Sequence, residues 1–150
     1  MEIDMQHRTD SSLERTAGAA LAVLIVLQTT MLGALFSSTP PHPPLVVAPF
    51  ALGPFLGAAI ALPVAALVLG AARTREGRAA SGVAALFALV SFGPQKWFDP
   101  AFAQIWPAVV LAQISIVALG WALYRRTRTV SGGDTGSGAY AGRAMPMREH

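Results

Sequence analysis

Four long apolar runs constrain this chain more than any other feature of its sequence. They cover about residues 16–36, 45–72, 79–97 and 101–124, and the third reaches that length only by including residues 93–97. A helix needs about 20 apolar residues, rising 1.5 Å each, to cross roughly 30 Å of hydrocarbon. The runs therefore predict an all-α integral membrane protein, folded as a four-transmembrane-helix bundle.

The basic residues predict how this bundle is oriented. Every positive charge except Lys96 is an arginine, and the arginines precede the first run, separate the second from the third, or follow the fourth. Loops rich in arginine and lysine stay in the cytoplasm, so both termini are predicted to be cytoplasmic. Because these charges flank apolar runs, the expected partner is the lipid bilayer and no nucleic acid is expected. The preference for arginine indicates a GC-rich bacterial genome, and hence a multi-pass protein of the bacterial inner (plasma) membrane.

Polar segments are predicted on either side of a membrane domain at residues 13–128. Residues 1–12 form a short polar lead, and residues 129–150 are rich in glycine, serine and threonine, which predicts a flexible tail. Ser11 and Glu14 match a capping box, which predicts a helix start at this point. A cleaved signal peptide is the alternative for the first run. It is disfavoured because the lead is acidic and the run is too long.

Small residues recur every four positions in the second run, at Gly53, Gly57 and Ala61. In lipid, helices attract each other mainly where small side chains let their backbones approach closely. We favour helix packing within the bundle for this stripe, and a homodimer seam is the alternative. Pro49, Pro54 and Pro63 lie in the same run and predict an irregular, central helix.

Ionisable residues are missing from the centre of every run, and the chain has no cysteine. Proton-coupled exporters need a buried carboxylate, and haem or di-metal bundles need inward-facing histidine or glutamate. We therefore expect no catalytic residue, no metal site and no cofactor. Two amides, Gln28 and Gln113, are predicted to lie near mid-membrane. The favoured interpretation is that they pair with each other, and the alternative is that they line a path for a ligand or water.

The stretch "GPQKWFDP", residues 93–100, is predicted to be the outer turn between the third and fourth runs. Trp97 suits the membrane interface, and the long stem of Lys96 can reach from a short helix to water and pair with Asp99. We favour anchoring as the role of this turn. The alternative is that these three residues and His42 form an outward-facing site for an anionic head group or a quinone ring.

Three function classes remain open from the sequence. The leading one is a non-enzymatic accessory or interaction subunit, whose partners are other membrane helices in a homo-oligomer or a larger membrane complex. The second is an oligomeric channel or transporter for small solutes. The third is a small quinone-linked redox protein. It is implied by a resemblance in overall plan, four helices with both termini inside, to the DoxX-like families of bacterial membrane proteins.

Overall fold

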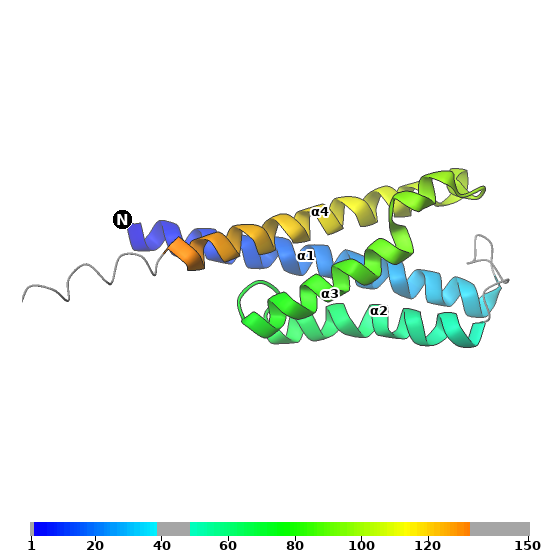
Figure 1. Cartoon of the computed structure of the whole chain (residues 1–150), viewed down its shortest axis with the longest axis horizontal. Coiled ribbons are helices and arrows are strands. Elements are labelled where there is room, and N and C mark those ends of the chain that lie inside the picture. The colour runs from blue at the N-terminus through cyan, green and yellow to red at the C-terminus, as the bar shows by residue number, and fades with distance from the viewer. Residues whose placement is uncertain (1, 39–48, 133–150) are drawn as a thin grey trace, which may run out of the picture.

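The computed structural model describes residues 2–38 and 49–132, which form four long helices and one short 3₁₀-helix (Figure 1). These elements are α1 (Glu2–Ser37), α2 (Pro49–Leu69), α3 (Arg75–Phe92), η1 (Pro94–Phe98) and α4 (Phe102–Gly132). The stretches long and apolar enough to cross a membrane are Arg8–Ser37, Ala51–Leu69, Arg75–Phe98 and Phe102–Arg128. The prediction of an all-α chain with four helices of membrane-spanning length and apolarity is confirmed.

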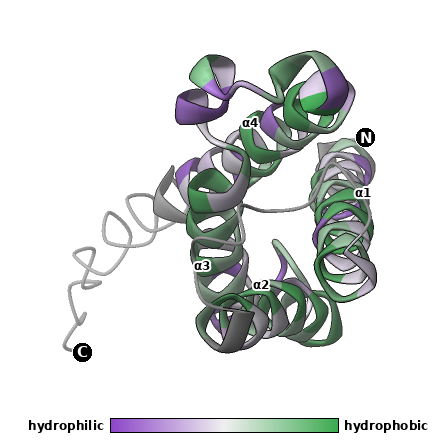
Figure 2. Cartoon of the chain, turned by 90° about the vertical axis from the view of Figure 1, so that its right-hand side faces the viewer, coloured by the Kyte–Doolittle hydropathy of each residue, from purple (hydrophilic) through white to green (hydrophobic). Residues whose placement is uncertain are grey.

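The four helices run alternately up and down, and each takes one corner of a bundle (Figure 2). α1 packs against α2 and α4, and α3 packs against the same two helices. The start of α1, the α2–α3 turn and the end of α4 lie together on the left of Figure 1, and we call this the arginine end. The opposite end carries η1 with Lys96, and we call it the lysine end. α2 is not the central helix that its prolines suggested, because it occupies a corner like the others.

The bundle core is built mainly from alanine and leucine. Leu21, Leu24, Leu56 and Leu119 are almost completely buried, and they are accompanied by the buried alanines 17, 20, 66, 84, 88, 112 and 122. Small side chains at the contacts let the helix backbones approach closely, which is how helices attract each other in lipid. Other apolar side chains point outward, with Val68 81% exposed and Val117 71% exposed. This distribution suits a bundle whose surroundings are apolar.

The predicted helix start at Ser11 is wrong, because α1 already begins at Glu2. The hydroxyl of Ser11 donates to the carbonyl of Arg8 one turn earlier, so it does not cap a helix end. Asp10 forms an ion pair with Arg126 of α4, and the first turns of α1 lie beside the last turns of α4 (Figure 1). The polar lead is therefore helical next to its partner helix. Of the predicted tail, residues 129–132 complete α4 and the remainder lies outside the described residues.

The α2–α3 turn ends α2 earlier than predicted and starts α3 earlier. Gly70 has φ +86°, a left-handed conformation that favours glycine and terminates a helix. α3 then starts at Arg75 rather than near residue 79, with the hydroxyl of Thr74 accepting from the Gly77 N–H at 2.9 Å. α2 has 21 residues, enough for about 31 Å, which is close to the hydrocarbon thickness of a membrane. Residues 45–48 of that run lie outside the described residues.

Side chains from α1 and α3 hold this turn in place. A carboxylate oxygen of Glu14 on α1 accepts from the Ala72 N–H at 2.8 Å, and the hydroxyl of Ser81 on α3 donates to the Ala71 carbonyl at 2.9 Å. Gly77 lies so close to Gly70 that an added Cβ would collide with the Gly70 carbonyl oxygen. The turn is therefore packed backbone against backbone, with its polar groups bonded to the neighbouring helices.

Candidate functional site

The broken end of α3 is the most polar place inside the bundle. α3 stops at Phe92, which is only 7% exposed, and the chain then turns at Gly93 toward η1 and the lysine end (Figure 1). The last carbonyl groups of any helix have no partner within that helix. In hydrocarbon each unsatisfied backbone group costs several kcal/mol, so such an end needs other donors.

Two glutamine amides supply donors to this helix end. The Nε2 group of Gln95, on η1, donates to the carbonyl of Leu89 at 3.2 Å and to that of Val90 at 2.8 Å. The Nε2 group of Gln113, on α4, donates to the carbonyl of Phe92 at 3.1 Å. Three carbonyl groups of the last turn of α3 are thus satisfied by side chains that come from beyond the break.

Gln113 also connects α3 to the outer turn. Its Oε1 atom accepts from the indole N–H of Trp97 at 3.3 Å, and the Trp97 ring lies 5.0 Å from the ring of Phe102, centroid to centroid. Trp97 is 49% exposed. The favoured role of this ring was that of an interfacial anchor, and it also belongs to the hydrogen-bond network around Gln113.

Gln28 reaches the same helix end from α1. It is 1% exposed, and its Nε2 group donates to the hydroxyl of Ser91 at 3.1 Å. Its Oε1 atom is buried without a hydrogen-bond partner. The predicted pairing of Gln28 with Gln113 is wrong, because each amide bonds instead to the end of α3, where backbone and hydroxyl acceptors are concentrated. We call Gln28, Ser91, Gln95, Trp97 and Gln113 the amide cluster.

Lys96 and Asp99 form an ion pair in the outer turn. The Lys96 ammonium lies 2.9 Å from Oδ2 of Asp99, and both side chains are about one-quarter exposed. The other oxygen of Asp99 accepts from the Ala101 N–H at 3.0 Å. The hydrogen bond from Lys96, followed by that from the Ala101 N–H, lowers the pKa of Asp99 below its ordinary value. His42, the fourth member of the predicted outward-facing cluster, lies outside the described residues.

The small-residue stripe of α2 does not face the bundle as we had favoured. Gly57 and Ala61 are exposed, and a Cβ placed on Gly57 would meet nothing within 4 Å. Gly53 is half-buried, with the Phe36 ring 3.9 Å from its would-be Cβ. The prediction of helix packing within the bundle is therefore wrong for Gly57 and Ala61. α2 packs through Leu56, Ala59, Pro63 and Ala66 instead.

The chemistry available at the amide cluster is hydrogen bonding. Glutamine, serine and tryptophan side chains do not change protonation state at ordinary pH, so the cluster holds backbone groups in place through hydrogen bonds between neutral groups. In the part of the chain that the structure describes, no three His, Cys, Asp or Glu side chains are grouped to hold a metal ion.

The roles of two polar residues, Gln95 and Glu14, had not been expected from the sequence. Gln95 follows Gly93 and Pro94, and an amide just past a helix-ending Gly-Pro pair is the signal that could have revealed its role. Glu14 was assigned to a capping box and is bonded to Ala72 instead, 58 residues away along the chain. No local sequence pattern predicts a contact between residues so far apart along the chain.

Comparison with known proteins adds no family assignment. No protein-family model, no curated protein and no solved structure matches the chain. The resemblance to the DoxX-like plan therefore rests on helix number and predicted orientation alone, and functional inference has to come from the geometry described above.

Proposed function

We propose that this chain is a small protein of the bacterial inner membrane that serves as a non-enzymatic interaction subunit and binds another membrane helix through α2. The observation that carries the proposal is the outward-facing stripe of Gly57 and Ala61, which α2 does not use within the bundle. Ala65, four residues further on, is also exposed and extends the stripe. A face of this kind admits a second backbone at close range, which is the usual source of helix attraction in lipid.

The outward faces of α3 and α4 carry large aliphatic side chains without a comparable run of small residues every four positions. Leu86 and Val90 on α3 are 62% and 64% exposed, and Val117 on α4 is 71% exposed. Bulky, flexible side chains suit contact with lipid tails, whereas glycine and alanine leave a shallow surface that a partner helix can fill. The contrast supports α2, rather than α3 or α4, as the face that binds a partner.

The bundle interior also supports a structural role. Its buried hydroxyl groups bond to the protein itself, Ser81 to the Ala71 carbonyl and Ser115 to the Leu111 carbonyl, while Ser91 accepts from Gln28. These contacts stabilise the helices and their ends. The proposed orientation places the arginine end in the cytoplasm, following the distribution of arginine between the two ends.

Cysteine cross-linking tests the proposed face directly, because the natural chain contains no cysteine. We would introduce Gly57→Cys or Ala61→Cys and oxidise intact membranes. Each variant should form a covalent adduct with a partner helix, either a second copy of this chain or another polypeptide identified by its mass. The matched control is Leu86→Cys, exposed on α3, which should form none.

A second variant measures whether the face is needed for assembly. Gly57→Leu should separate the two backbones and reduce the native mass of the purified protein to that of the single chain, while Val68→Leu, also exposed on α2, should not. A single copy bound to other polypeptides supports the accessory-subunit proposal, and a closed homo-oligomer supports the channel alternative. Wild-type yield and wild-type assembly size in Gly57→Leu would mean that this face contacts only lipid.

A further inference from the structure

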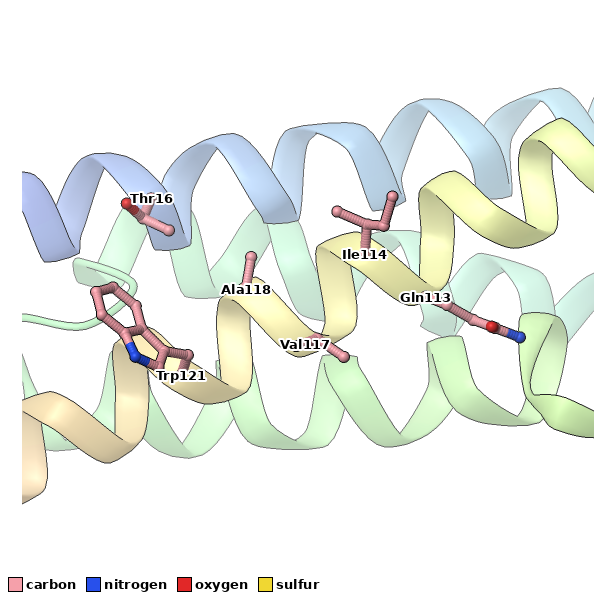
Figure 3. A pocket seen from close by; sticks show the side chains of 6 residues that line it. All are labelled: Thr16, Gln113, Ile114, Val117, Ala118 and Trp121. Carbon is pink, nitrogen blue, oxygen red and sulfur yellow. The ribbon is translucent and has the colours of Figure 1, made fainter.

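An apolar groove runs along α4 on the surface of the bundle. It has a volume of about 510 Å³ and is lined by Thr16 of α1 and by Gln113, Ile114, Val117, Ala118 and Trp121 of α4 (Figure 3). Ile114 and Ala118 point toward α1, and the Trp121 ring lies at the side of the groove nearest Thr16. The groove is elongated along the helix, because its lining residues on α4 recur at intervals of three and four.

Two arginines continue the same face of α4 toward the arginine end. Arg125 and Arg128 follow Trp121 by four and seven residues, so they lie on the same side of the helix. The Arg125 guanidinium lies 5.2 Å from the centroid of the Trp121 ring, and that of Arg128 lies 4.8 Å from the centroid of Tyr124. Arg15, next to the groove residue Thr16 on α1, is also exposed at this end.

These cation–π contacts help to position the guanidinium groups. They do not require the N–H donors, whose planar arrangement suits the oxygens of a phosphate. The opposite end of the groove offers no comparable charge. It is closed by Gln113, whose amide is already bonded to Phe92 and Trp97.

We propose that this groove is a binding site for an anionic phospholipid. An acyl chain lies along Ile114, Val117 and Trp121, and the phosphate of the head group is bound by Arg125 and Arg128. Charge complementarity favours an anionic lipid, because the apolar groove ends in arginines on one side only and an anionic head group lacks the positive charge that neutralises phosphatidylcholine. Tryptophan and tyrosine at the head-group level are also typical of a membrane interface.

Native mass spectrometry of the full-length protein, extracted from vesicles of equal phosphatidylglycerol and phosphatidylcholine, tests this proposal. The wild-type protein should retain phosphatidylglycerol in preference to phosphatidylcholine. Exchanging Arg125→Gln and Arg128→Gln should weaken that retention about fivefold for each arginine, since one basic side chain near an anionic surface contributes on the order of 1 kcal/mol. The matched control exchanges Arg73→Gln and Arg75→Gln, which are exposed at the same end but away from the groove.

A second variant fills the groove without changing charge. Val117→Trp should reduce retention of the bound lipid, whereas Val68→Trp, placed on the exposed surface of α2, should leave it at the wild-type level. The changed positions are Arg125 and Arg128 in the first test variant, Val117 in the second and Val68 in the steric control. All of them are exposed on helices, so the helical content measured by circular dichroism should not change. Equal retention of the two lipids by the wild-type protein would overturn the proposal. Equal losses in the test and control arginine variants, or wild-type retention in Val117→Trp, would overturn it as well.

Discussion

The two ends of α3 satisfy their backbone groups in different ways. At the arginine end, a carboxylate from α1 binds the turn, with Glu14 accepting from the Ala72 N–H. Thr74, which caps α3, and Ser81 on α3 bond to nearby backbone. At the other end, which is buried at Phe92, neutral amides from η1 and α4 donate to the last carbonyls of the helix.

The surroundings of the two ends account for this difference. Glu14 is half-buried at the arginine end, where a charged carboxylate can serve as an acceptor at less cost than in the bundle interior. The broken end of α3 lies between the other helices, where an unpaired charge would be expensive, so the donors there are uncharged glutamines. The comparison teaches that a short membrane helix can stop inside a bundle if side chains of suitable charge meet both of its ends.

The largest loss of stability is expected where Gly77 packs against Gly70 at the arginine end. Gly77→Val should destabilise the bundle by more than about 3 kcal/mol, above the usual range for overpacking, because the added atoms collide with the Gly70 backbone and not with a movable side chain. Accumulation of the protein in membranes is the measurement, and Gly82→Val, where an added Cβ meets nothing within 4 Å, is the control. Similar accumulation of the two variants would show that the turn is looser than described.

A smaller loss of stability is expected when the amide of Gln113, which binds the C-terminal end of α3, is removed. Gln113→Leu should cost about 1–3 kcal/mol for the Phe92 carbonyl left unpaired, with a further contribution from the Trp97 indole. Unfolding of the purified protein in mixed micelles gives the difference in free energy of unfolding. Gln104→Leu, at an exposed position on the same helix, should leave stability nearly unchanged. If both variants unfold alike, the amide cluster does not stabilise the end of α3.

The smallest effect concerns the carboxylate of Glu14. Glu14→Ala should lose about 1–2 kcal/mol of stability, because the Ala72 N–H loses its charged acceptor, whereas Glu14→Gln should lose less than about 1 kcal/mol because its amide oxygen can still accept. The same unfolding assay measures both values. A loss in Glu14→Gln as large as in Glu14→Ala would mean that the negative charge matters more than the acceptor geometry, and the two ends of α3 would differ more than we infer.

The sequence predicted some features of α3 and missed others for identifiable reasons. Its apolar composition predicted a span at residues 79–97, but α3 ends at Phe92 and residues 94–98 form the separate η1, so the predicted end was about five residues too late. The proximity of Lys96 and Asp99 is a contact between residues three apart, so the turn itself implied their ion pair. Gln28 and Gln113 were recognised as polar residues within spans, but their partners were wrong. Depth estimates along a helix do not say which neighbour an amide will face.

Length, hydropathy and the distribution of arginine determined the number of spanning helices and the difference between the two ends, because each is a property of consecutive residues. Which face of each helix turns inward was decided only by the tertiary structure. α2 is apolar on every side, so its sequence contains no amphipathic pattern to show that Leu56 and Ala66 point to the core while Gly57 and Ala61 point away. The contacts of Gln28 with Ser91 and of Glu14 with Ala72 join residues 63 and 58 positions apart. They depend on the rotation and depth of whole helices, which arise from packing the small side chains of the core.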